Sequence, residues 1–344
     1  MSFERLTSVV RVISFYFTAL MLMLVVGGIL QVELGLVGIP IYQVLIYLLL
    51  PILFVRTVER KPIKPFLRLN MLTFKGVAKA VLLGVTCWFM VQQLSTALIL
   101  LLHQFDGEMI QPYDFLMDAP VWLLAIVGML IPAIVEEVSF RGYVLGALRP
   151  LGPVAAVVAT GLLFGMLHMS LVRLIPLSLL GMVWAYVVQR TNSILPGMIM
   201  HFVNNGIALG LTVLLSNQVN AADLSVTESI PALGMWLMIG LYGSMAVGAG
   251  IGAFFLARSF SPADLAHPAE ALAAEEALQQ KPDTELLLEQ AVELPPEYRA
   301  MSQELALLRE RRRRWLVTGG VLAGLGTLLV YGFAVYQELS VVFG

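Results

Sequence analysis

Charged residues are scarce in this chain of 344 residues, since Asp, Glu, Lys and Arg together make up only 13% of it. Soluble globular domains carry about 25%. Hydrophobic residues make up 59%, and the mean hydropathy is +0.86. The formal net charge is −2, so no global charge would attract a nucleic acid. This composition excludes an ordinary soluble enzyme, a nucleic-acid-binding protein and a disordered scaffold, and it predicts a polytopic membrane protein.

Cysteine is almost absent. The single one, Cys87, lies within an apolar run. A lone cysteine excludes a disulfide framework and a zinc site built from cysteines. Chemistry in this chain must therefore depend on other ionisable or polar side chains.

Long apolar segments are what the chain does have. Each approaches the length of about 20 residues that a helix needs to cross the hydrocarbon core of a bilayer. They predict an all-α polytopic membrane bundle of about nine transmembrane helices, with a cytoplasmic helical insertion before the last. The expected spans are about 12–30, 39–55, 77–102, 121–148, 153–171, 174–189, 194–214, 231–257 and 315–338.

The distribution of basic residues predicts the orientation. The loop after the second expected span is rich in Lys and Arg, whereas the next loop carries His103, Asp106, Glu108, Asp114 and Asp118 and no basic residue. By the positive-inside rule, the N-terminus lies in the cytoplasm and the C-terminus outside. The basic residues expected on the cytoplasmic side are Arg56, Arg60, Lys61, Lys64, Arg68, Lys75, Lys79, Arg141, Arg149, Arg190, Arg258 and Arg311 to Arg314.

Composition also suggests a division of the chain. The segment 258–314 is rich in charged residues and ends in a run of arginines. Such a run is typical of a stop signal that meets anionic headgroups. This segment is also where a cytoplasmic partner would bind. The predicted parts are 1–119 (N-terminal transmembrane helices), 120–214 (central membrane core), 215–257 (eighth span), 258–314 (charged cytoplasmic segment) and 315–344 (last helix).

Ionisable side chains inside spans are candidates for function, because burying them in lipid is costly. Here they are Glu136, Glu137 and Arg141 in the fourth span, His168 in the fifth, and His201 with Asn205 in the seventh. Neighbouring residues point about 100° apart around a helix, so Glu136 and Glu137 cannot enter the same small site. Glu137 precedes Arg141 by four residues, the favourable order for a structural ion pair. Glu136, stacked above Phe140, is then free to face a cavity.

An acid, two imidazoles and a carboxamide around one hydrated cavity suit hydrolysis by an activated water. A glutamate shielded from bulk water is a suitable base for the proton of that water. One histidine can hold the water, while the other and the amide can donate to an oxyanion. The same side chains, Glu136, His168 and His201, could instead bind zinc or another divalent metal and leave a fourth position open. The residues leave both possibilities open.

The spacing of these residues resembles a known family. Glu-Glu-x-x-x-Arg at 136–141, Phe-x-x-x-His at 164–168 and His-x-x-x-Asn at 201–205 are similar, in order and approximate spacing, to the motifs of the CAAX-protease and bacteriocin-processing (CPBP) family of intramembrane proteases. The run Arg-Thr-Asn-Ser-Ile-Leu at 190–195 resembles the lead-in to the last motif. The resemblance covers about residues 120–206, and the signatures of other intramembrane proteases are absent from the sequence.

The resemblance implies an intramembrane endopeptidase in a bacterial or archaeal plasma membrane, with its site below the cytoplasmic surface. Glu136 would be the water-activating base and His168 its partner. His201 and Asn205 would stabilise the oxyanion, and Phe140 and Phe164 would line the pocket. The implied partners are the lipid bilayer and a membrane-tethered protein or peptide substrate, for example a prenylated CAAX-type protein.

Two other functional classes remain possible. The first is a proton-coupled transporter with Glu136, His168 and His201 as a relay, although the chain has no internal repeat or paired broken helices. The second is a non-catalytic immunity or assembly factor that keeps the fold and uses 258–314 to recruit a partner. The intact set of motifs argues against this second class.

Overall fold

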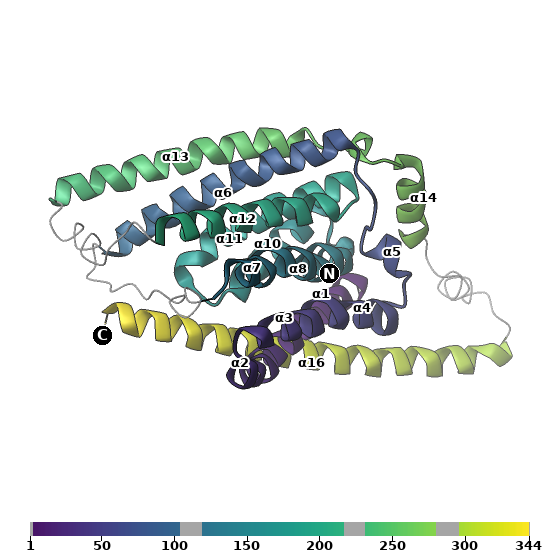
Figure 1. The fold of residues 1–344 in the computed structure, drawn as a ribbon. Coiled ribbons are helices and arrows are strands. Elements are labelled where there is room, and N and C mark those ends of the chain that lie inside the picture. Colours follow the sequence, from purple (N-terminus) through teal and green to yellow (C-terminus); the bar gives the residue numbers. More distant parts are fainter. Residues whose placement is uncertain (1–2, 104–118, 217–230, 280–295, 344) are drawn as a thin grey trace.

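The computed structural model describes residues 3–103, 119–216, 231–279 and 296–343. In these ranges the chain is helical, apart from short connections and one isolated β-bridge between Leu72 and Leu265, and its long helices lie side by side (Figure 1). Seven helical stretches are long and apolar enough to cross a membrane. The expected all-α polytopic fold is therefore confirmed. The seven stretches are Phe3–Glu59, Phe74–Leu102, Val121–Ala147, Leu171–Thr191, Leu195–Leu214, Leu233–Arg258 and Val317–Glu338.

The first stretch, Phe3–Glu59, contains two of the expected spans because it reverses direction near Gly35. Gly35 has a φ of 57°, which glycine adopts without steric cost. A Cβ atom on Gly38 would overlap the carbonyl oxygen of Leu30, so a second glycine lets the two arms meet closely. The elements of this hairpin are α1 (Phe3–Leu22), η1 (Met23–Gly27), α2 (Gly28–Leu34), η2 (Gly35–Val37), α3 (Gly38–Gln43), η3 (Val44–Leu49), α4 (Leu50–Phe54) and η4 (Val55–Glu59).

The span that carries the paired glutamates is not a uniform α-helix. It alternates between α-helical and wider π-helical turns, and Pro132 has no N–H to continue the backbone ladder. Glu136 and Glu137 stand where an α-helical turn gives way to a π-helical one, an irregularity that is frequent at functional sites. Its elements are α7 (Val121–Leu124), η6 (Ala125–Leu130), α8 (Ile131–Glu137), η7 (Val138–Val144) and α9 (Leu145–Ala147).

Three helices continue the core: α10 (Pro153–Leu167), α11 (Leu171–Thr191) and α12 (Leu195–Ser216). α10 is shorter than the expected fifth span of 153–171 and ends just before His168. α10 and α11 approach closely through glycines, since a Cβ on Gly181 would lie 2.9 Å from the Cα of Gly161. This close contact fixes the end of α10 against the rest of the core.

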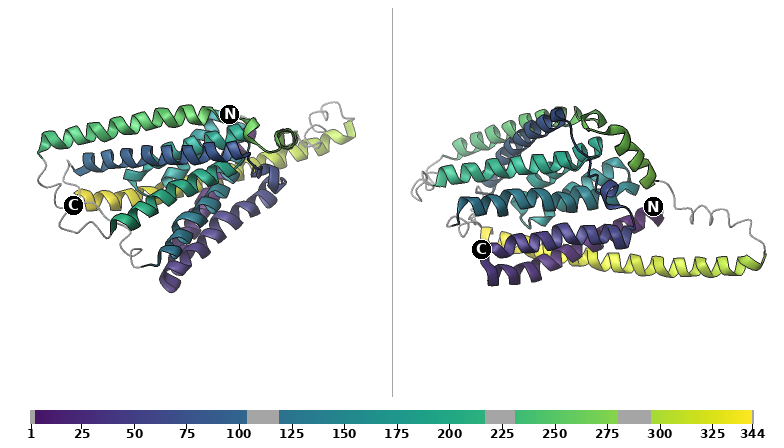
Figure 2. Two further views of the ribbon diagram at one scale, coloured as in Figure 1. Left: turned by 45° about the horizontal axis from the view of Figure 1, so that its top comes forward. Right: turned by 45° about the vertical axis from the view of Figure 1, so that its right-hand side comes forward.

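The outer helices are α6 (Phe74–His103), α13 (Ala232–Arg258) and α16 (Pro296–Phe343). α13 packs along α6, and α16 packs along α1 through Gly320 and Gly326, which face Val10 and Phe17. α16 is one unbroken helix whose first turns extend past the end of the bundle (Figure 2). α16 runs without a break through residue 314. The division of the chain at this residue stays a prediction.

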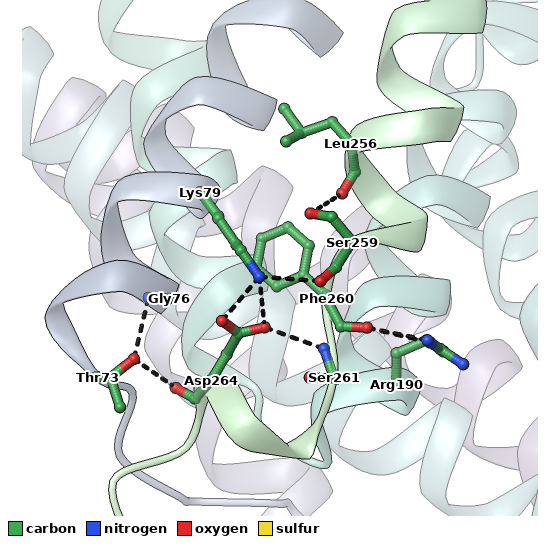
Figure 3. A network of polar contacts seen from close by, with 9 residues as sticks. All are labelled: Thr73, Gly76, Lys79, Arg190, Leu256, Ser259, Phe260, Ser261 and Asp264. Carbon is green, nitrogen blue, oxygen red and sulfur yellow. Dashed lines mark hydrogen bonds and ion pairs between the residues drawn. The ribbon is translucent and has the colours of Figure 1, made fainter.

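Residues 259–279, which we call the strap, cross one end of the bundle and include η10 (Pro262–Asp264) and α14 (Pro268–Gln279) (Figure 1). Asp264 is the main attachment. Lys79 lies 2.9 Å from both of its carboxylate oxygens and also donates to the carbonyl of Ser259 at 2.9 Å (Figure 3). The backbone N–H of Ser261 donates to the same carboxylate at 3.0 Å. Part of the segment expected to recruit a partner is thus packed on the chain itself.

Further contacts tie the strap to the core. Arg190 donates to the carbonyl of Phe260 at 3.1 Å, and Arg149 forms an ion pair with Glu275 at 2.9 Å. Lys61 donates to the carbonyl of Leu278 at 3.1 Å. Several basic residues expected on one side therefore do meet at one end of the bundle. That this end faces the cytoplasm stays a prediction, and the acids at 106, 108, 114 and 118 lie outside the described residues.

Arg68 links the strap region to the glutamate-bearing span. It belongs to the basic loop expected after the second span; its side chain is only 3% exposed and donates to the carbonyl of Arg141 at 3.4 Å. Burial and the neighbouring Arg149 lower the pKa of Arg68 to about 9, whereas Glu275 opposes the shift. Arg68 is therefore still charged at neutral pH, and Glu275 of the strap offsets part of the unfavourable effect of its burial.

We expect Asp264→Ala to release the strap, because it leaves Lys79 and the N–H of Ser261 without their buried acceptor. The cost in the free energy of unfolding is about 1–3 kcal/mol. Melting in detergent micelles and limited proteolysis between residues 262 and 279 measure both effects. Asp264→Asn keeps an acceptor oxygen, so its free energy of unfolding should fall less than that of Asp264→Ala. Glu276→Ala, at an exposed acid of the same segment, is the matched control, and equal protease sensitivity of all variants would contradict the expectation.

Candidate functional site

Glu137 stands at the centre of a buried polar cluster. Its Oε1 accepts a hydrogen bond from Nη1 of Arg141 at 2.8 Å and another from Nδ1 of His201 at 3.0 Å. The side chains of Glu137 and Arg141 are fully buried, and that of His201 is 5% exposed. A carboxylate can only accept, so Nδ1 of His201 carries the hydrogen. One carboxylate thus holds a cation on its own helix and a ring from α12.

A glycine makes room for this carboxylate. A Cβ on Gly197 would lie 2.5 Å from Oε2 of Glu137, too close for any side chain. Oε2 itself has no hydrogen-bond partner among the described residues. The start of α12 can therefore approach the glutamate-bearing span only because residue 197 is glycine.

Aromatic rings surround the cluster. The guanidinium carbon of Arg141 lies 4.2 Å from the ring centre of Phe164 and 5.2 Å from that of Trp184. The Trp184 ring centre is 5.0 Å from that of His201, and the Phe164 ring centre is 5.2 Å from that of His168. Phe140 packs edge-to-face on Phe164 at 5.3 Å. These ring faces stabilise a guanidinium that is removed from water.

Glu136 differs from its neighbour. Its side chain is half-buried, and among the described residues it forms neither a hydrogen bond nor an ion pair. It lies within electrostatic reach of His201, Tyr42 and Tyr47. The carboxylate of Glu136 therefore has no fixed partner and can accept a proton from another molecule, whereas Oε1 of Glu137 is held by Arg141 and His201.

His168 directly follows the last residue of α10. Its Nδ1 lies 3.1 Å from the carbonyl oxygen of Phe164, so Nδ1 carries the hydrogen and, in the neutral ring, Nε2 is an acceptor. The chain then turns sharply, since Met169 has a φ of 47°, and Ser170 caps α11. The ring of His168 is thus oriented by its own helix.

The last helix holds this turn in place. Glu338 of α16 accepts a hydrogen bond from the hydroxyl of Ser170 at 2.8 Å and another from the backbone N–H of Leu171. Both donors lie within three residues of His168. The carboxylate also stabilises the N-terminus of α11, where the helix dipole is positive. The last span, which the family resemblance leaves unexplained, therefore supports the segment that presents His168.

Asn205 lies one helical turn beyond His201. Its Nδ2 donates to the carbonyl of Gly128 at 2.9 Å, and its Oδ1 accepts from Nδ2 of Asn204 at 3.1 Å. These two bonds orient the amide, and Nδ2 keeps a second N–H that neither bond uses. Asn205 is thus held against η6 by one N–H, while the other can bind a ligand.

Most of the expected site residues lie in one set of contacts. Glu137, Arg141, His201, Phe140, Phe164 and His168 are joined directly or through a shared ring. The candidate metal ligands are different: in the described ranges no group of three His, Cys, Asp or Glu side chains could hold a metal ion. Glu136, His168 and His201 therefore do not fit the proposed metal site in this arrangement.

Sequence reasoning missed several residues. Trp184 and Gly197 contact the cluster, and Tyr42 and Tyr47 lie near Glu136. No sequence motif marks these residues, because an apolar or small residue within a membrane span is normally interpreted as part of the helix packing. Only the pairing of helices places them next to ionisable groups.

Comparison with known proteins supports the resemblance seen in the sequence. Residues 118–207 match the family model described as "Type II CAAX prenyl endopeptidase Rce1-like". The matched part includes the glutamate-bearing span, α10, α11 and the half of α12 that carries His201 and Asn205. The match supports an intramembrane endopeptidase, a membrane-embedded hydrolase, as the general class. No curated protein and no solved structure matches the chain.

We expect Glu137→Ala to destabilise the protein strongly, because it leaves the buried Arg141 cation without its partner and removes the acceptor for His201. Breaking a buried ion pair from one side costs about 3–5 kcal/mol. The measurement is unfolding of the purified protein in detergent micelles. Glu136→Ala is the matched control, since that carboxylate has no fixed partner, and it should melt close to the parent. Equal losses for the two variants would contradict the different roles.

We expect Glu338→Ala to loosen the turn after His168. Hydrogen bonds to a charged acceptor contribute about 1.5–3 kcal/mol, so the amide of Leu171 should exchange its hydrogen at least about tenfold faster. Hydrogen exchange on peptides covering residues 166–174 measures this. Glu338→Gln keeps an acceptor oxygen, so the Leu171 amide hydrogen should exchange more slowly in this variant than in Glu338→Ala. Unchanged exchange in both variants would show that α16 does not hold this turn.

Proposed function

We propose that the protein hydrolyses a peptide bond of a membrane-tethered protein or peptide, with a water molecule activated by Glu136. The main supporting observation is that the two adjacent glutamates have different surroundings. Glu137 is engaged by Arg141 and His201, whereas Glu136 is half-buried and has no hydrogen bond or ion pair in the described part of the chain. A general base needs a carboxylate of this second kind, which is partly shielded from water and is not already bound by another group.

In the proposed reaction, Glu136 takes a proton from water as the water oxygen attacks the carbonyl carbon of the scissile peptide bond. The carbonyl oxygen becomes an oxyanion. Glu136 then returns the proton to the leaving nitrogen as the carbon–nitrogen bond breaks, which gives a carboxylic acid and an amine. Nε2 of His168, an acceptor in the neutral ring, would hold the second hydrogen of the water.

Asn205 and His201 would stabilise the oxyanion. Asn205 has one N–H left after its bond to Gly128. His201 presents Nε2, which donates only when the ring is protonated, because Nδ1 is held by Glu137. The carboxylate of Glu137 orients the His201 ring, as the buried acid does in a Ser-His-Asp triad. We therefore propose that Glu137 both pairs with Arg141 and fixes the orientation of His201.

No step of the proposed reaction uses a metal ion, because in the described ranges the candidate ligands do not lie close enough together to bind one. The proton-relay alternative is weaker. The chain has no internal repeat of the kind that many transporters show, and in the described ranges the carboxylate of Glu136 forms no direct hydrogen bond with His168 or His201. Because the matched family is described as a prenyl endopeptidase, we propose a prenylated C-terminal peptide as the first substrate class.

We expect Glu136→Gln to lower kcat by about 10²–10⁴, because the amide keeps the shape of the carboxylate but cannot accept the proton of water. The assay uses the full chain in liposomes and a fluorogenic membrane-tethered peptide, with and without an isoprenoid. Glu270→Gln, at an exposed acid of α14, is the matched control and should cleave at the parental rate.

Melting of Glu136→Gln should match the parent, which separates loss of chemistry from loss of fold. Preincubation with a chelator should leave the parental rate unchanged. Cleavage by Glu136→Gln at the parental rate would overturn the proposed base. Loss of activity on chelation would instead return a metal ion to the mechanism.

A further inference from the structure

The hairpin Phe3–Glu59 carries an apolar groove lined by residues of both of its arms. The groove has a volume of about 570 Å³ and is lined by Leu22 and Val26 from one arm and by Leu45, Leu49, Leu53 and Arg56 from the other. Tyr47, on the same arm, has a buried side chain, and its backbone carbonyl oxygen accepts a hydrogen bond from the hydroxyl of Ser139 in the glutamate-bearing span. The two faces of this helix therefore serve different neighbours.

The groove has the dimensions of a lipid chain. From Leu45 to Arg56 the helix rises about 16 Å, close to half of the ~30 Å hydrocarbon core and thus to the depth of one leaflet. The groove is also open to the outside, since Leu45, Leu49 and Leu53 are 46%, 50% and 53% exposed. A single acyl chain could enter from the bilayer and lie along the whole groove.

The charge at one end identifies the headgroup. Arg56 is the one ionisable residue that lines the groove. Arg56, Arg60 and Lys64 are exposed and form no ion pair or hydrogen bond in the part of the chain that the structure describes. The nearby acid, Glu59, is already paired with Arg11 at 2.9 Å. The end of the groove thus presents uncompensated positive charge where a phosphate would lie.

We propose that this groove binds one anionic phospholipid, with an acyl chain between the two arms and the phosphate on Arg56. Arg60 and Lys64 favour a headgroup of net negative charge over a zwitterionic one, since each basic residue near the surface strengthens binding of anionic lipid. The site is independent of the proposed hydrolysis, because it uses no residue of the candidate site. Its occupant is a lipid of the surrounding bilayer.

Native mass spectrometry of the purified full chain tests the proposal, with phosphatidylglycerol and phosphatidylcholine of identical acyl chains titrated in detergent. We expect phosphatidylglycerol to bind more tightly. Arg56→Gln should weaken its binding about fivefold, the contribution of one basic residue. Leu49→Trp fills the groove and should weaken both lipids. Glycerophosphoglycerol, the headgroup without chains, should not compete.

Two control variants keep the changes local. Arg258→Gln removes an exposed cation at the end of α13, and Leu241→Trp enlarges a leucine on that helix that is 57% exposed. Both should bind lipid like the parent. Equal affinity for the two lipids would mean that the groove holds any bilayer lipid and would overturn the proposal. So would full phosphatidylglycerol binding by Leu49→Trp, because the lipid would then lie elsewhere.

Discussion

The buried carboxylate of Glu137 is the constraint on which the core of this protein depends. Two membrane-spanning helices meet at one oxygen, which accepts from Arg141 at 2.8 Å and from His201 at 3.0 Å. In a region from which water is excluded, neither the cation nor the acid is tolerated without the other. The rings of Phe164 and Trp184 and the missing side chain at Gly197 shape the space around this charge pair. Glu136 can remain uncommitted only because its neighbour satisfies these demands.

Parts of the chain outside the family match support this core from two sides. The strap closes one end of the bundle, where Asp264 binds Lys79, and Arg68 and Arg149 connect it to the span that carries Arg141. At the turn that follows His168, Glu338 of the last helix holds the start of α11. In both attachments, a carboxylate from the C-terminal part of the chain accepts hydrogen bonds from the core: Asp264 from Lys79, and Glu338 from Ser170. The added segments therefore act as structural clamps on the helices that carry the candidate site.

The N-terminal hairpin separates two environments. One face of its second arm packs through Tyr47 on the glutamate-bearing span, and the other lines the groove that ends at Arg56. Gly35 and Gly38 permit the tight reversal that brings the two arms together. A lipid bound in the groove would stiffen this hairpin without entering the hydrolytic site. Lipid binding and catalysis can therefore be measured separately in the same protein.

The sequence alone determined the all-helical membrane fold and the set of ionisable residues, because long apolar runs and rare buried charges are local properties. It also predicted that Glu136 and Glu137 point apart, since helical geometry depends only on spacing. Tertiary structure decided the rest. That His201 contacts Glu137 rather than Glu136, that Arg68 is buried, and that α16 continues unbroken through residue 314 all depend on how distant helices pack. Spacing along a chain sets the direction of a side chain, but only the neighbouring helix supplies its partner.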